Sequence, residues 1–105
     1  MNKKDKEQII KGMLTFAVLT QLAGSPKYGA ELLSILSKTP FATQIGTLYP
    51  LLNRLSADGL ISHAWQESTY GPPRKYYTLS KAGTQYLREL QKYWRELHKH
   101  LGGGK

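Results

Sequence analysis

Residues 43 to 58 form a predicted helix, one side of which carries hydroxyl, amide and guanidinium groups. At about 100° per residue, the leucines of this segment form a buried stripe, and the opposite side carries no acid before Asp58. The paired hydrogen-bonding groups of Asn and Arg match adenine and guanine edges in the major groove of B-DNA, which admits a helix whose other side chains are short. This face predicts base readout, the alternative being an ordinary solvated helix surface; its members are Thr43, Gly46, Thr47, Pro50, Asn53, Arg54 and Ala57.

Pro50 lies inside this predicted helix, where a proline removes a backbone donor and crowds the residue four back, at a cost of roughly 3 kcal/mol. That residue is Gly46, whose missing Cβ we expect to relieve part of the crowding. Two helix starts are open. A start near Thr43 places Pro50 two turns in and predicts a slight bend, whereas a start near Thr47 makes the proline nearly harmless. Gly59 is the predicted end, because glycine suits the left-handed position after a helix.

A second group of cations follows the turn-rich segment STYGPP, residues 68 to 73. Gly71 and the double proline after it stiffen and narrow the turn, and Arg74 and Lys75 come next. Two adjacent cations on a rigid finger suit a phosphate backbone or a narrow minor groove. A solvated hairpin end is the alternative. The role of Tyr49, in the helix predicted at 43–59, also has two alternatives: it packs at the edge of the core, or it places its hydroxyl on a phosphate.

Hydrophobic periodicity and turn residues give the order helix, helix, helix, hairpin, long helix. That order predicts a mainly α fold with a small β-hairpin, a winged helix-turn-helix with an additional long C-terminal dimerisation helix. Residues 1–79 form the expected DNA-binding unit, and residues 80–105 form the dimerisation helix and a flexible tail of the same continuous domain. The expected elements are helices at 4–23, 28–37, 43–59 and 80–101, and strands at 60–67 and 74–79.

The last helix has more apolar surface than a small core can cover. At 1.5 Å per residue it is roughly 30 Å long, so a second copy of the chain is the simplest cover. Ser80 is its expected N-cap. Its apolar stripe has near-heptad spacing and consists of Tyr86, Leu87, Leu90, Tyr93, Trp94, Leu97 and Leu101.

The composition narrows the function classes. The 105 residues carry a net charge of +8, which favours a polyanion or an anionic surface as partner, and there is no Cys for a disulfide, a thiolate metal site or a nucleophile. His98 and His100 point about 200° apart on a helix and cannot grip one metal. No nucleophile elbow, P-loop or dinucleotide fingerprint occurs. We therefore expect no enzyme, catalytic residue, metal or cofactor, and a cytoplasmic protein without a signal peptide or membrane span.

Three runs closely resemble the PadR family of bacterial transcription regulators: YGAELL at 28 to 33, GTLYPLLNRLSADGLI at 46 to 61, and GPPRKYYTLSKAG at 71 to 83. The match covers roughly residues 9 to 95, and the short last helix fits the small-protein branch of the family. The resemblance implies a homodimeric repressor on a palindromic operator, with the first and last helices interleaving across the two-fold axis. Carried over by position, it implies DNA contacts at Thr47, Tyr49, Asn53, Arg54, Gly71, Arg74 and Lys75.

The resemblance also suggests an effector site. In some members a planar aromatic ligand lies at the dimer interface between tryptophans of the last helix, and Trp94, with Tyr93 beside it, matches that position. Simple packing in the interface is the alternative. Two further functions stay open: a winged-helix protein-interaction module that docks through its last helix without base readout, and a metabolite sensor whose main chemistry is the Trp94 pocket.

Overall fold

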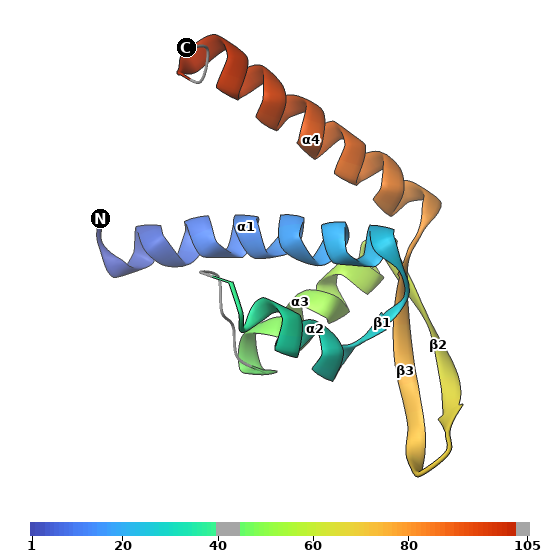
Figure 1. Ribbon diagram of the computed structural model, residues 1–105. Coiled ribbons are helices and arrows are strands. Elements are labelled where there is room, and N and C mark those ends of the chain that lie inside the picture. Colours follow the sequence, from blue (N-terminus) through green and yellow to red (C-terminus); the bar gives the residue numbers. More distant parts are fainter. Residues whose placement is uncertain (40–44, 103–105) are drawn as a thin grey trace.

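Figure 1 shows a computed structural model of the protein, which describes residues 1–39 and 45–102. The described part is mainly helical, with a small sheet and a long C-terminal helix, as the sequence predicts. The hairpin projects away from the helices, and α4 runs antiparallel to α1 above the rest of the molecule. The elements are α1 (Lys3–Gly24), β1 (Lys27–Tyr28), α2 (Gly29–Leu36), α3 (Ile45–Ala57), β2 (Ile61–Ser68), β3 (Gly71–Leu79) and α4 (Lys81–Leu101).

One hydrophobic cluster joins the four helices to the base of the sheet. The helices α1, α2 and α3 contribute apolar residues three or four positions apart, which is the spacing of one helix face, and α4 contributes Leu87. Burying a leucine side chain stabilises the folded state by about 1.5–3 kcal/mol, so this cluster supplies most of the free energy that favours folding. Of the predicted leucine stripe of α3, Leu48, Leu52 and Leu55 are confirmed as part of it, and Leu51 packs against it partly buried. Its members are Leu14, Val18, Leu19, Leu22, Leu32, Leu36, Leu48, Leu52, Leu55, Ile61, Tyr77 and Leu87.

The end of α3 and the start of α4 are tied together by their caps. Gly59 has φ +75°, and the N–H of Leu60 donates to the carbonyl oxygen of Leu55 at 3.0 Å, which confirms the predicted glycine stop. The Ser80 hydroxyl accepts from the N–H of Gly83 at 2.9 Å and donates to the carbonyl oxygen of Gly59 at 2.6 Å. The predicted N-cap Ser80 therefore also joins the first turn of α4 to the end of α3.

The sheet has three strands in the order β1-β3-β2, not the two that we expected. The additional strand, β1, pairs Lys27 with Tyr77 and Tyr28 with Tyr76. The predicted strand start at Arg74 is also wrong, because β3 begins at Gly71. Pro72 and Pro73 lie in the part of β3 that does not pair with β1. The missing N–H of each proline therefore removes no hydrogen bond on the β1 side of the strand.

The helix α3 carries Pro50 in its interior. Its described backbone is helical from Ile45, so the alternative start near Thr47 is wrong; Thr43 lies outside the described residues. A Cβ added to Gly46 would meet no atom within 4 Å outside the backbone of its own helix. The expected relief by glycine is therefore wrong, because proline crowds the carbonyl group of that residue, which every amino acid has. Both residues are exposed, so water can hydrate the carbonyl that lacks its partner.

Candidate nucleic-acid interface

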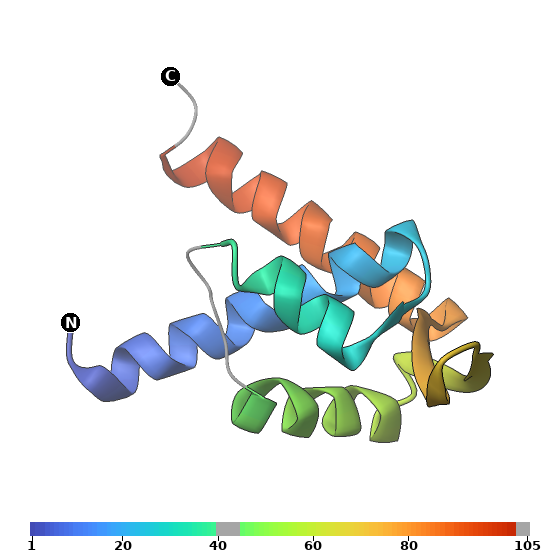
Figure 2. The ribbon, with the colours of Figure 1, turned by 60° about the horizontal axis from the view of Figure 1, so that its bottom comes forward.

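The helix α3 lies at the outside of the molecule, with α1 and α2 on its inner side (Figure 2). Leu48, Leu52 and Leu55 are fully buried and Leu51 is partly buried, whereas Thr47, Asn53 and Arg54 are exposed. Gly46, Pro50 and Ala57, the small residues of the predicted face, are also exposed. The residues expected to enter a major groove thus share the free side of one helix.

Tyr49 points towards α2. Its side chain is half-buried and packs against the core cluster, and its hydroxyl and ring lie directly over Gly29, where an added Cβ would collide with them. Of the two alternatives for Tyr49, the geometry favours the edge of the core. Gly29 is then required because the aromatic ring comes so close to the backbone at the start of α2.

Arg54 is held by α1. Its Nη2 atom donates to Oγ1 of Thr15 at 3.3 Å, and the buried Thr15 hydroxyl donates in turn to the carbonyl oxygen of Lys11 at 3.1 Å. A cleft of about 220 Å³ lies beside this contact and is lined by Lys11, Leu14, Thr47, Pro50, Leu51 and Arg54. The participation of Lys11 and Thr15 could not be read from the pattern of α3, because they belong to another helix.

The hairpin of β2 and β3 is the wing of this fold, and its two cations, Arg74 and Lys75, lie on different aromatic partners. The guanidinium carbon of Arg74 lies 4.6 Å from the ring centroid of Tyr28, and that ring meets Tyr76 edge-on at 5.4 Å between centroids. Lys75 lies with its Nζ 5.4 Å from the ring centroid of Tyr77. Successive residues of a strand face opposite sides, so the two adjacent cations serve different faces of the hairpin. Gly71 is exposed where β3 begins, at the tip.

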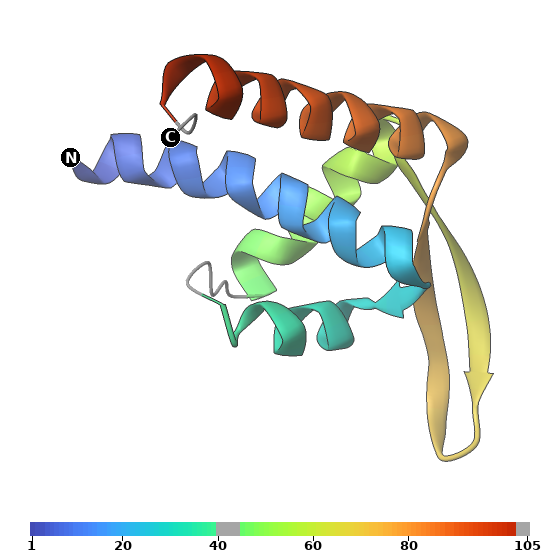
Figure 3. The same ribbon diagram turned by 45° about the horizontal axis from the view of Figure 1, so that its top comes forward.

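An apolar groove of about 590 Å³ separates α1 from α4, which lie side by side in Figure 3. Tyr93 is 66% exposed and Trp94 is 62% exposed, although both line it. The groove is lined by Gln8, Ile9, Gly12, Met13, Phe16, Ala17, Leu90, Tyr93, Trp94 and Leu97. A single chain therefore leaves apolar surface open on both terminal helices.

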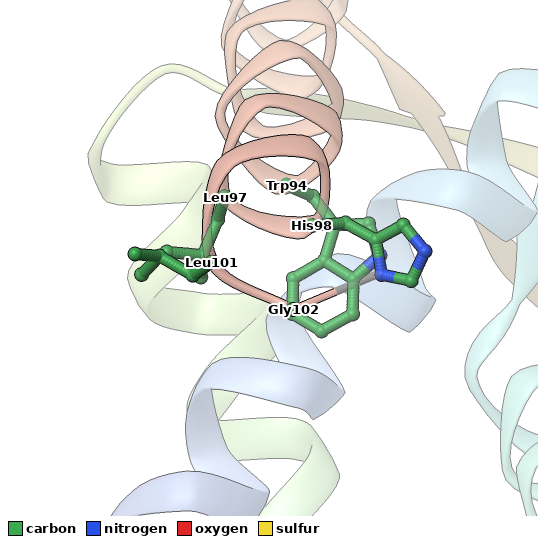
Figure 4. Close-up of a pocket in the computed structure, with 5 residues that line it drawn as sticks. All are labelled: Trp94, Leu97, His98, Leu101 and Gly102. Atoms are coloured by element: carbon green, nitrogen blue, oxygen red, sulfur yellow. The ribbon is translucent and has the colours of Figure 1, made fainter. Parts of the chain in front are cut away.

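Trp94 also borders a second hollow, of about 360 Å³, at the end of α4. Figure 4 shows the rings of Trp94 and His98 close together on one side of the helix, with Leu97 and Leu101 on the other. In the described residues no three His, Cys, Asp or Glu side chains are placed to hold a metal ion. Nor does that part of the chain contain a helix both long and apolar enough to cross a bilayer.

Comparison with known proteins agrees with this arrangement. The family model described as "Transcriptional regulator PadR-like family" matches residues 18–89, more than half of the chain. The transcriptional regulator Rv3488 of Mycobacterium tuberculosis is 36% identical over 87 residues, which cover 83% of this chain and 80% of that protein.

Solved structures give the same result. A PadR-like transcription factor from Bacteroides fragilis is 40% identical, with a TM-score of 0.83 over 98% of this chain and 100% of that one. A PadR-like regulator from Bacillus cereus is 32% identical, with a TM-score of 0.81 over 91% and 94%. The chain therefore belongs to the PadR-like family of transcriptional regulators.

Proposed function

We propose that two copies of this chain form a homodimer that binds a palindromic operator and represses transcription. The observation that carries the proposal is the outward face of α3, which presents Thr47 and Asn53 to solvent without an acidic neighbour in the described helix. The net charge of +8 favours a polyanionic partner. The residues proposed to meet DNA are Thr47, Asn53 and Arg54 on α3, and Gly71, Arg74 and Lys75 on the wing. Tyr49, also expected there from the sequence, is not included because its hydroxyl lies over Gly29 of α2.

The groove between α1 and α4 supports the dimer. Exposed apolar surface shared by two neighbouring helices is typical of an interaction site. A second copy would cover this surface and would set the two α3 helices at a fixed separation, which a palindromic operator requires.

The contacts are tested by substitution at Asn53 and Lys75. Asn53→Ala should cost roughly 1–3 kcal/mol of preference for the selected sequence and little affinity for mixed-sequence DNA. Lys75→Ala should lower affinity for both duplexes by a similar factor, since a phosphate contact is independent of sequence. Lys92→Ala, which removes an exposed charge from α4, is the control. Equal losses on both duplexes for both variants would contradict these roles.

An effector site at Trp94 and Tyr93 is the finer part of the proposal. Two copies of Trp94 near a two-fold axis would offer faces on which a planar aromatic ligand stacks, worth about 0.5–1.5 kcal/mol beyond the buried area. In a Trp65→Phe background, which leaves one tryptophan, planar aromatic compounds should quench the fluorescence of Trp94. Unchanged fluorescence across such a panel would remove the effector site and leave operator binding standing.

The same groove also favours a second function, a protein-interaction module that docks on another protein through α4. A groove lined by exposed Tyr93 and Trp94 suits a partner helix as well as it suits a second copy. This alternative predicts a monomer in solution without a preferred duplex, so light scattering together with DNA binding separates the two.

A further inference from the structure

The cleft between α1 and α3 brings together cations from two helices. Lys11 of α1 and Arg54 of α3 both line it, and Thr47 adds a hydroxyl. None of the described residues that line it is acidic. A hollow of about 220 Å³ with two positive side chains and no neutralising partner in its wall is an electrostatic site for an anion.

The guanidinium of Arg54 is oriented by the protein but keeps donors free for a ligand. Its contact with Thr15, at 3.3 Å, uses one N–H, whereas a guanidinium has five. Thr15 is a firm anchor because it is 8% exposed and its hydroxyl is bound to the backbone of α1. This arrangement pulls the side chain of Arg54 towards α1 rather than straight out from the helix axis.

We propose that this cleft holds one backbone phosphate of the DNA duplex. Arg54 supplies forked donors, Lys11 the second cation, and Thr47 a hydroxyl donor. The inference rests on the proposed DNA binding and deepens it: Arg54 becomes a phosphate contact and base discrimination passes to Asn53. A phosphate held jointly by α1 and α3 fixes the position of α3 on the duplex, which is what backbone contacts do.

The test compares Lys11→Ala with Lys6→Ala, both measured on a mixed-sequence duplex over a range of salt concentrations. Lys6 is an exposed lysine of the same helix, about 140° around its axis from Lys11, and serves as the matched control. Because Lys11 is exposed and alanine favours helix, circular dichroism should show both variants folded.

Lys11→Ala should lose about tenfold in affinity, as for one charge-assisted hydrogen bond. Its log–log salt slope should fall by about 0.9, the value for one phosphate fewer. Lys6→Ala should keep both quantities. The pair Lys11→Ala and Arg54→Ala should lose less than the product of the single losses, since both side chains hold the same phosphate.

Two results would overturn the inference. The first is a Lys11→Ala variant within about twofold of the original protein and with the same salt slope, while the original binds DNA normally. The second is an Arg54→Ala variant that loses affinity only for the selected sequence, which would make Arg54 a base contact. If the original protein binds no duplex at all, the proposed function is wrong, and this inference is wrong with it.

Discussion

At the scale of single residues, Tyr28 connects the sheet, α2 and the wing. Its backbone belongs to β1, its N–H donates to Oε1 of Glu31 in α2 at 3.3 Å, and its ring lies under the guanidinium of Arg74. An arginine stacked on an aromatic face gains about 0.5–2 kcal/mol and loses freedom of orientation. Tyr28 is therefore a positioning residue for Arg74.

Replacing Tyr28 by alanine should reduce DNA affinity, because Arg74 loses the ring that orients it. The loss should be about 0.5–2 kcal/mol, the range for a cation–π contact, and Tyr28→Phe should restore most of it. Titration of a mixed-sequence duplex measures both variants. If Tyr28→Ala lowers affinity by the same factor in an Arg74→Ala background, the two side chains act independently and the role assigned to Tyr28 is wrong.

At the scale of elements, the first turn of α4 approaches the connection between α3 and β2 through a glycine. A Cβ on Gly83 would collide with the carbonyl oxygen of Leu60 and would lie 2.9 Å from Cδ1 of Leu79. The backbone N–H of Ser80 also donates to that Leu60 oxygen, at 3.1 Å. The packing of α4 on the core thus depends on the missing side chain at position 83.

Gly83→Ala should lower the free energy of unfolding by about 1–3 kcal/mol, the usual cost of overpacking, because backbone atoms cannot move aside cheaply. Gly46→Ala is the matched control, since it adds the same methyl group to a helix where it meets nothing outside its own backbone. That change should be neutral or stabilising by up to about 1 kcal/mol. Urea unfolding measures both; equal stability of the two variants would contradict the close approach.

The helices could be predicted from the sequence because their signals are local. The spacing of leucines and the caps Ser80 and Gly59 lie within a few residues of the features that they specify. The strand β1 could not be predicted, since two residues carry no pattern and their partners lie far along the chain. The division at residue 79 stays a prediction.

The candidate site shows the same limit. The free face of α3 follows from its periodicity, but the contacts that orient Arg54, Arg74 and Tyr49 each join two elements. Arg54 with Thr15, Arg74 with Tyr28, and Tyr49 over Gly29 are such pairs, and only the tertiary structure brings them together.

At the scale of the whole molecule, the open groove between α1 and α4 is the surface that the proposed dimer would cover. Leu97 lines the groove and is 51% exposed, so a charge there should spare the fold of the chain and disfavour a partner. Leu97→Glu should therefore be folded but monomeric by light scattering, and should bind DNA more weakly because two half-sites are no longer held together. Gln85→Glu, an exposed change on the same helix that also adds one negative charge, is the control. A Leu97→Glu variant that remains dimeric would place the interface elsewhere.

Selection of binding sites from random duplexes by the purified protein tests the proposed dimer and its operator together. A dimer that forms through α1 and α4 should enrich a sequence with two-fold symmetry, whose half-sites lie about one turn of the DNA helix apart. Enrichment of a single asymmetric site, or of none, would contradict the proposed dimeric operator-binding repressor.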